Sequence, residues 1–375
     1  MTTAVVAGAL ATKAWNGGNA WTRVTWLVAL ERLGFDTWFV ERVPPGPTMT
    51  ERVEWARTVL SAEAPGAGSV FLGPDDEVVV AGPTAAEVVA NAGLLVNISG
   101  HLPGAVVDGA RAGASVFLDD DPVYTQVWAE SGAGAPGLGD HDVHCTYGLN
   151  VGRPECPVPT LGLEWHPLLP PVLLDRWTAA PAEPGAPVTT VGTWRSPFGT
   201  LAHGAQVYGG KHREFRRVIE LPSMVDAAFA LALDVHPAEV DDLAALSAHA
   251  WKVVEAASAV GDTASYRRWV HASAAELSAA QGAYVGTGCG WLSDRTAAYL
   301  AAGRPAVVQD TGAGCHLPVG EGLLVWHDIG DAVTGVEAVL ADPARHAAAA
   351  RRLAAEHFDA AVVAGRVCEL AGVTP

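Results

Sequence analysis

Basic residues are scarce in this sequence. Its 375 residues include 23 Lys plus Arg against 41 Asp plus Glu, which gives a formal net charge of −18. Such a charge repels phosphate backbones and anionic lipid, and no cluster of Lys and Arg is large enough to reverse it locally. We therefore expect neither a nucleic acid nor a membrane surface among the partners of this protein.

Cysteine and long hydrophobic runs are also lacking. The five cysteines are scattered, with no Cys-x-x-Cys pair and no histidine at metal-ligand spacing, and their odd number argues against a disulfide framework. No apolar run reaches the roughly 18 residues of a membrane span, and the first residues lack the charged and apolar regions of a signal peptide. These absences predict a soluble, cytoplasmic protein with reduced thiols.

Hydrophobic residues make up half of the chain, which excludes a disordered protein and suits two compact domains at this length. Short apolar runs alternate with segments of helical spacing, and this alternation predicts an α/β layer fold. The predicted strands are residues 5–10, 34–41, 93–98, 115–118, 143–147, 188–193, 228–233, 251–255, 283–285, 306–309 and 323–326, and the predicted helices include 241–249 and 293–302.

A proline-rich segment divides the chain. Three prolines lie in residues 179–187, where they prevent a helix or a central strand because they fix φ and lack an N–H donor. We place the domain boundary there, between one Rossmann-like domain over residues 1–180 and a second over residues 188–358. Residues 359–375 are expected to form a C-terminal helix that packs back on the first domain.

The strongest local pattern lies in residues 290–312. Two groups of polar residues stand in it: Ser293, Asp294 and Arg295 at a helix start, and Asp310, Thr311 and Gly312 after a strand. A helix start offers free N–H groups and a positive dipole end to an anion, and α/β proteins bind ligands at the carboxyl ends of strands. The pattern predicts a phosphate site, although an ordinary helix–turn–strand segment with polar surface residues would look the same.

Several segments resemble the nucleotide-sugar glycosyltransferases of the GT-B fold, and the resemblance runs through the whole chain. The Gly-x-Pro turn in residues 299–308 is similar to the segment that contacts the donor diphosphate and ribose in those enzymes. Further matches to a bacterial subgroup lie at residues 96–101, 119–126, 141–146, 211–215, 273–312 and 354–358. The resemblance implies two facing Rossmann-like domains with a cleft between them, the first for the acceptor and the second for the nucleotide sugar.

The resemblance also implies donor-binding residues in the second domain. Lys211 follows a Gly-Gly turn and resembles the basic residue that neutralises the donor diphosphate, although a solvated lysine would fit the pattern too. The Glu-x7-Glu pair of many retaining GT-B enzymes falls here on Gly290 and Ala298. A ribose contact would therefore come from Glu276 or from the Ser293–Asp294 helix start, and Glu276 could equally be a buried structural residue.

Glycine and tryptophan near the N-terminus are candidates for contact with the acceptor. In the resemblance, Gly17 and Gly18 face the cleft and let the backbone approach a sugar or acceptor. Trp15 and Trp21 beside them could stack on that ligand, unless they belong to the core, where aromatic residues at helical spacing are more often found.

An inverting transferase also needs a group that takes a proton from the acceptor hydroxyl. Asp121 ends a strand with an overhanging carboxylate and is our first candidate, followed by His101 and His141. Each histidine could instead be a hydrogen-bonded structural residue. Residues 119–121 contain the Asp-x-Asp spacing of a metal site in the other large transferase fold, but we expect no metal in a chain of two Rossmann-like halves.

The sequence thus predicts a glycosyltransferase that moves a sugar from a nucleotide-sugar donor to a small-molecule acceptor, of the kind found in secondary metabolism. No cofactor is expected beyond the donor substrate. Two alternatives stay open: a GT-B sugar-nucleotide epimerase, which uses the same donor pocket without an acceptor, and a catalytically silent GT-B partner protein, which the missing Glu pair suggests.

Overall fold

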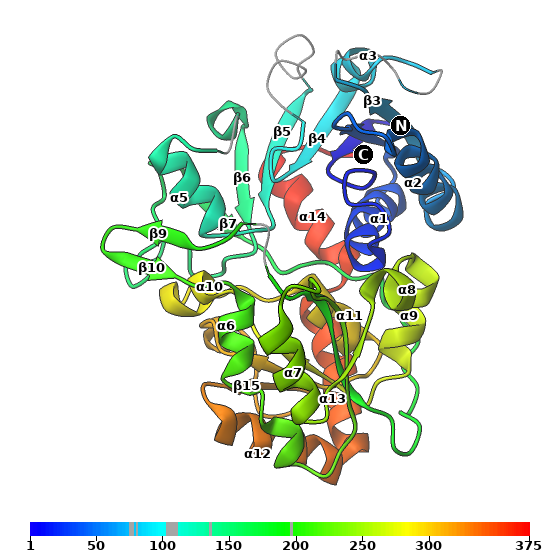
Figure 1. Cartoon of the computed structure of the whole chain (residues 1–375). Coiled ribbons are helices and arrows are strands. Elements are labelled where there is room, and N and C mark those ends of the chain that lie inside the picture. The colour runs from blue at the N-terminus through cyan, green and yellow to red at the C-terminus, as the bar shows by residue number, and fades with distance from the viewer. Residues whose placement is uncertain (75–78, 80–81, 103–111, 135–136, 196–197) are drawn as a thin grey trace. The chain divides into compact units, whose positions relative to one another are not determined.

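The computed structural model describes residues 1–74, 79, 82–102, 112–134, 137–195 and 198–375. The chain divides into two compact units (Figure 1). Unit 1 comprises Met1–Arg153, Val158–Leu173 and Asp359–Pro375, and unit 2 comprises Pro154–Pro157 and Leu174–Phe358. Residues 179–187, the predicted boundary, lie inside unit 2 and form no helix or strand.

Unit 1 is built on a seven-stranded sheet in the order β3-β2-β1-β4-β5-β6-β7, in which neighbouring strands are parallel. The strands are β1 (Thr3–Ala7), β2 (Asp36–Arg42), β3 (Gly68–Leu72), β4 (Ala92–Ile98), β5 (Ala114–Asp119), β6 (Val143–Thr146) and β7 (Trp165–Pro167). Helices cover such a sheet on both faces, which is why β1, β4 and β5 are nearly continuous runs of buried residues.

Among the described residues, most helices of unit 1 lie between these strands in the chain, and the last one follows unit 2. They are α1 (Gly17–Arg32), α2 (Met49–Glu63), α3 (Ala85–Ala90), α5 (Tyr124–Ser131) and α14 (Ala360–Ala371), with a 3₁₀ turn at Leu138–Asp140. The last helix, α14, packs against α1 and contacts β5 and β6 (Figure 1, red beside blue). The backbone N–H of Ala360 also donates to the carbonyl of Val172 at 3.0 Å. Unit 1 is therefore assembled from the beginning and the end of the chain.

Unit 2 contains a six-stranded parallel sheet in the order β12-β11-β8-β13-β14-β15. Its strands are β8 (Val188–Thr193), β11 (Phe229–Asp234), β12 (Lys252–Val254), β13 (Ala275–Ser278), β14 (Ala306–Gln309) and β15 (Leu323–Trp326). A small antiparallel hairpin, β9 (Leu201–His203) and β10 (Gln206–Tyr208), follows β8.

The helices of unit 2 surround a buried cluster in which Phe215, Leu246 and Val336 join strand residues such as Leu231 and Val307. The helices are α6 (Lys211–Arg216), α7 (Val240–Ala248), α8 (Ala256–Val260), α9 (Thr263–His271), α10 (Gly282–Thr287), α11 (Asp294–Ala301), α12 (Ile329–Ala341) and α13 (Pro343–His357), with 3₁₀ turns at Leu174–Arg176, Leu221–Ser223 and Ala313–Cys315. The predicted helices at 241–249 and 293–302 are confirmed as α7 and α11.

One predicted strand is wrong. Residues 283–285 belong to helix α10, which ends at Gly288 in the left-handed region with φ of 57°. The strand between β8 and β14 is instead β13, over Ala275–Ser278. Residues 283–285 were predicted as a strand because three apolar residues in a row fit a buried strand and a buried helix equally well. Strand β13 was missed because it carries a glutamate, which is not expected in a central strand. That glutamate, Glu276, is fully buried.

Candidate functional site

Polar side chains gather in each unit where the strand order reverses. In unit 1 this point lies between β1 and β4, and in unit 2 between β8 and β13. The loops that follow the carboxyl ends of these neighbouring strands lead to opposite faces of the sheet and leave room for a ligand. Each unit therefore has one natural place for a ligand, at the carboxyl ends of its central strands.

In unit 1 the loop after β1 is held by a buried carboxylate. Glu41, at the end of β2, accepts from the backbone N–H groups of Leu10 (2.9 Å) and Ala11 (2.7 Å) with one oxygen and of Thr12 (2.7 Å) with the other. Burial raises the pKa of this carboxyl, although the backbone hydrogen bonds act in the opposite direction. The loop that leads to α1 is thus fixed by a residue that the sequence analysis did not single out.

The loops after β4 and β5 bring a histidine into a charged cluster. Arg23 of α1 donates from Nη2 to Asp120 Oδ2 at 3.1 Å, and the Ser99 hydroxyl donates to the other oxygen of Asp120. Burial, followed by the charges of Arg23 and Lys13, lowers the pKa of His101 to about 4. Burial would raise the pKa of Asp120, but the same two cations outweigh it and lower that pKa. At neutral pH the cluster holds a neutral imidazole beside an ionised carboxylate.

Of the three consecutive aspartates, Asp119 is structural. Its carboxylate is fully buried and accepts from Thr125 Oγ1 (2.7 Å), Gln126 Nε2 (2.7 Å) and Thr146 Oγ1 (2.8 Å). Burial raises its pKa to about 6 against the effect of these three hydrogen bonds. Asp119 thereby ties the start of α5 to the end of β6.

The leading sequence candidate for the base, Asp121, is half-buried at the turn into α5. Its backbone carbonyl accepts from the Thr125 hydroxyl at 3.3 Å, and its charge adds to the effect of burial in raising the pKa of Tyr124 to about 12. The aspartate that pairs with Arg23 is the preceding residue, Asp120. Neighbouring residues at a strand end point in different directions, so the sequence alone could not choose between them.

His141, another candidate base, belongs to the core of unit 1. Its Nδ1 lies 2.8 Å from the carbonyl of Gly137 and therefore carries a proton, and its Nε2 lies 3.1 Å from the amide nitrogen of Asn97, from which it accepts. The ring packs edge-on against Phe117 with centroids 5.4 Å apart. Burial lowers its pKa. With both ring nitrogens in use, His141 has no position left to take a substrate proton.

The glycine loop at the start of α1 has one exposed aromatic residue. Trp15 is 45% exposed and has a φ of 59°, in the left-handed region that non-glycine residues rarely adopt. Asn16 caps α1 by accepting from the N–H of Asn19 at 3.0 Å, and Gly17 is the first residue of the helix with Gly18 after it. Trp21 is only 4% exposed and belongs to the core. Of the two tryptophans, Trp15 is thus the one available to a ligand.

In unit 2, two cations lie at the carboxyl end of β8. A methyl group built on Gly192 would stand 3.4 Å from Lys211 Nζ and 3.9 Å from Arg295 Nη1. The first turn of α6 is held there because the backbone N–H of Lys211 donates to Gln281 Oε1 at 2.9 Å, in the loop after β13. Gly192, which has no side chain, thus lies beside two positive charges, Lys211 Nζ and Arg295 Nη1.

Arg295 is a buried residue with partners on three sides. Its Nε donates to Glu276 Oε1 (2.5 Å), its Nη2 to Ser278 Oγ (2.5 Å) and its Nη1 to the carbonyl of Val191 (2.7 Å). Burial would lower the pKa of the guanidinium, but Glu276 outweighs it and raises that pKa. Glu276 therefore positions Arg295 and lies behind it, rather than forming the exposed ribose contact that the sequence analysis considered.

The start of α11 is capped by its own side chains. The backbone N–H of Arg295 donates to Ser293 Oγ (3.2 Å) and to Asp294 Oδ1 (2.9 Å). Ser293 is buried, and Asp294 is half-buried. These two predicted donor-binding residues are therefore placed at a genuine helix start, with their oxygens turned toward the helix backbone.

The loop after β14 is ordered by hydrogen bonds of its own. Asp310 Oδ1 accepts from the N–H of Gly312 (2.9 Å), whose φ of 86° makes the turn, and Asp310 Oδ2 lies 3.1 Å from His327 Nε2. The Thr311 hydroxyl donates to the carbonyl of Trp291 at 2.5 Å, which joins this loop to the segment before α11. The two groups predicted from residues 290–312 are thus brought together.

A glutamine that was not predicted as a site residue connects the end of β14 to the loop after β13 and to α6. Gln309, the last residue of β14, accepts from the N–H of Ala280 (3.0 Å) and donates to Glu214 of α6 (2.7 Å). Arg217 donates to the same carboxylate at 2.9 Å. Gln309 could have been recognised in the sequence, because a side-chain amide in an apolar strand will be buried and will require hydrogen-bond partners.

The described residues also bear on metal and membrane sites. No group of three or more His, Cys, Asp and Glu side chains in them has the arrangement of a metal site. No helix within the same residues has the length and apolar character needed to span a bilayer.

Comparisons with solved structures find the same architecture over the whole chain. Anabaena HepE in complex with UDP and glucose matches with a TM-score of 0.62 and 10% identity, over 98% of this chain and 99% of that one. An alpha-glucosyltransferase in complex with UDP and a 13-mer DNA matches with a TM-score of 0.63 and 10% identity over 100% of both chains.

A putative UDP-N-acetylglucosamine 2-epimerase from Listeria monocytogenes matches with a TM-score of 0.50 and 12% identity, over 97% of this chain and 94% of that one. No protein-family model matches the sequence, and no curated protein does. The chain has the GT-B fold, with two Rossmann-like halves of seven and six parallel strands.

Proposed function

We propose that this protein is a glycosyltransferase that takes a sugar from a nucleotide diphosphate donor, and that the diphosphate binds in unit 2 at the carboxyl ends of β8 and β13. The observation that carries the proposal is the pair of cations, Lys211 and Arg295, beside Gly192 near the end of β8. Proteins of similar fold have been observed with UDP and with UDP-glucose, which supports a ligand of this class.

The proposed chemistry depends on negative charge that grows as the donor breaks. The bond between the anomeric carbon and the diphosphate oxygen breaks with its electron pair left on the diphosphate, and the acceptor oxygen bonds to the anomeric carbon. A cation fixed before the reaction stabilises that charge more in the transition state than in the ground state. The guanidinium of Arg295 is held by Glu276, and the backbone of Lys211 is held by Gln281, so Arg295 and the first turn of α6 need little reorganisation.

The other predicted donor-binding residues have a secondary place in this proposal. Ser293 and Asp294 cap α11, and residues 310–312 order the adjoining loop, so both groups shape the edge on which the nucleotide would lie. The sugar, ribose or base would contact their backbone more than their side-chain oxygens, which already have partners.

On the acceptor side, we propose His101 as the base, ahead of Asp121. The acceptor hydroxyl loses its proton as the new bond forms, and a neutral imidazole can accept it. His101 is neutral at neutral pH and can therefore accept a proton; the Asp120 carboxylate favours the imidazolium that results, while Arg23 and Lys13 oppose it. The proposed acceptor is a small molecule with a hydroxyl group, which the exposed ring of Trp15 could contact.

Kinetics of nucleotide release test this assignment. We expect His101→Gln to lower acceptor-dependent turnover by about 10²–10⁴-fold with donor affinity unchanged, because a base acts on the chemical step. Asp121→Asn is the matched comparison and should leave turnover within a few-fold of the wild type. If Asp121→Asn abolished turnover and His101→Gln did not, the base would be Asp121.

A sugar-nucleotide epimerase is the second candidate, favoured by the likeness to the Listeria structure. The two reactions differ in what they need from a second substrate, because an epimerase converts the nucleotide sugar without any acceptor. Nucleotide release that requires an added hydroxyl compound would support transfer. Conversion of the donor in the absence of such a compound would support epimerisation.

A further inference from the structure

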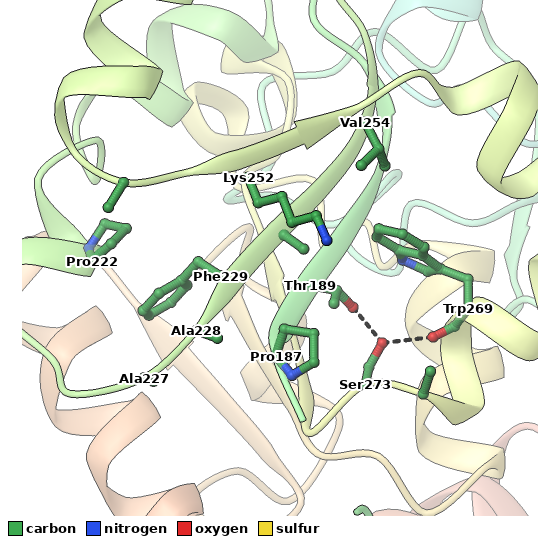
Figure 2. Close-up of a pocket in the computed structure, with 13 residues that line it drawn as sticks. Pro187, Thr189, Pro222, Ala227, Ala228, Phe229, Lys252, Val254, Trp269 and Ser273 are labelled. Carbon is green, nitrogen blue, oxygen red and sulfur yellow. Dashed lines mark hydrogen bonds between the residues drawn. The ribbon is translucent and has the colours of Figure 1, made fainter. Parts of the chain in front are cut away.

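Unit 2 has a cavity at the amino ends of its strands, whereas Lys211 lies at their carboxyl ends (Figure 2). The cavity has a volume of about 560 Å³, which is within the range of small-molecule sites. It lies at the amino ends of three parallel strands, because its lining includes Pro187 before β8, Ala228 before β11 and Lys252 at the start of β12. Trp269, near the end of α9, forms one wall.

Apolar groups form most of the cavity surface. The apolar residues that line it are Pro187, Pro222, Ala227, Ala228, Phe229, Ala230, Ala250, Val254 and Ala272. Many of these residues are alanines, whose side chains are too small to fill the cavity. Ala228, Ala250 and Ala272 are exposed. Water in such a cavity has few partners, so an apolar ligand body would displace it favourably.

The hydroxyl groups in the cavity wall are already used by the protein. Ser273 Oγ donates to the carbonyl of Trp269 (2.8 Å), so the Thr189 hydroxyl must donate to Ser273 Oγ (2.6 Å) and accept from Tyr299 (2.7 Å). Figure 2 shows the first two of these bonds beside the cavity. This chain of hydrogen bonds leaves neither hydroxyl proton for a ligand.

Two donors around the cavity have no protein partner in the part of the chain that the structure describes: a buried indole N–H and the ammonium group of the exposed Lys252. The indole Nε1 of Trp269 is buried and has no acceptor. Lys252 is the one charged residue of the lining, and none of the described carboxylates forms an ion pair with it. Figure 2 shows its side chain extending across the cavity, with the nitrogen on the side of Trp269. A buried N–H without an acceptor is unusual in a folded protein and calls for an explanation.

We propose that this cavity binds a small amphipathic carboxylate, whose flat apolar body lies on the alanine floor and whose carboxylate accepts from Lys252 and from the indole N–H of Trp269. Both free groups are donors, one of them is charged, and no acidic residue lines the cavity, so the missing partner is an anion with an apolar body. A carboxylate has two oxygens and can accept from both groups at once.

Calorimetric titration of the full-length protein with 1-naphthoate tests the proposal, with 1-naphthamide as the neutral isostere. We expect the carboxylate to bind at least about tenfold more tightly than the amide, because a hydrogen bond to a charged group is lost in the latter. Lys252→Met should weaken naphthoate binding by a similar factor, and Trp269→Phe, which keeps an aromatic ring but removes the N–H, by about fivefold. Arg345→Met, which removes an exposed positive charge from α13, is the control and should have no effect.

The opposite results would overturn the proposal. Equal affinity for the carboxylate and the amide, unchanged binding in Lys252→Met, or no binding of naphthoate up to about 5 mM would each exclude the site. Ala228→Leu provides a check that does not depend on the charged residue, because a larger side chain at the exposed opening should block naphthoate without disturbing the core. Saturating UDP should leave naphthoate affinity unchanged, so the outcome is independent of the proposed nucleotide site at the other edge of the sheet.

Discussion

His101 shows how a single residue gains its chemistry from its surroundings. Its sequence position, after an apolar run, indicated only a residue at a strand end. The structure surrounds it with Arg23, Lys13 and Asp120, and the balance of burial and positive charge lowers its pKa to about 4. None of these neighbours is close in sequence, and for that reason the effect could not be predicted without the fold.

The lowered pKa makes a prediction with a definite sign. Between about pH 6.5 and pH 4 the unfolded chain binds a proton at His101 and the folded chain does not, so this residue's contribution to stability should fall as the pH falls. The difference in unfolding free energy between the wild type and His101→Gln should change by up to about 1.4 kcal/mol per pH unit across this window. Urea unfolding at several pH values measures it, and an NMR titration of His101 at or above pH 6.5 would contradict it.

Lys211 and Gly192 differ in how well the sequence reveals them. Lys211 follows a Gly-Gly turn in a short basic segment, and this local pattern was enough to mark it as a candidate. Gly192 carries no such pattern, and its importance comes from the two cations that approach it from distant parts of the chain. Candidate residues were thus predictable where the signal was local, and contacts between distant segments were not.

At the scale of elements, most strands of both sheets and helices α7 and α11 follow from apolar runs and capping residues. The sequence did not predict β3, β7 or β13, and β13 carries the charged Glu276 in a central position, where sequence patterns expect an apolar residue. It is tolerated because Arg295 of α11 neutralises it. The arginine lies nineteen positions after the glutamate, at a separation beyond any local pattern.

This buried pair leads to a prediction about stability. Removing one partner, as in Arg295→Met, should lower the free energy of unfolding by about 3–5 kcal/mol, because Glu276 would be left charged and buried. Replacing both, as in Arg295→Met with Glu276→Leu, should be clearly less destabilising than the single change. Guanidinium unfolding of the wild type and the two variants is the measurement. A double variant that is less stable than Arg295→Met would show that the pair does more than neutralise charge.

At the scale of the whole molecule, the fold was predictable as two α/β halves because both alternate short apolar strands with helices. Residues 179–187 lie within unit 2, where they form no helix or strand. Residue Ala180 is still anchored there, since its carbonyl accepts from Arg304 Nη1 at 2.6 Å. The chain returns to unit 1 at Phe358–Asp359, so unit 1 depends on the last helix of the chain.

This path of the chain predicts the outcome of a single cut. The protease Glu-C should cleave after Glu183, which is exposed in the irregular segment. The two fragments should separate under denaturing conditions but elute together under native ones, because the C-terminal fragment carries α14, which packs against α1. Glu183→Ala provides the control that keeps the chain intact at this site. Fragments that separate without denaturant would contradict the assembly of unit 1 from both ends of the chain.

The central claim, a nucleotide diphosphate at the carboxyl ends of β8 and β13, is tested most directly by calorimetric titration of UDP into the wild type, Lys211→Met and Arg345→Met. Both variants lose one positive charge from unit 2, but Arg345 pairs with Glu321 on the exposed surface of the unit, away from the end of β8. The account predicts at least about tenfold weaker binding in Lys211→Met, equivalent to about 1.4 kcal/mol, and no change in Arg345→Met. Equal affinity of all three proteins for UDP would contradict it.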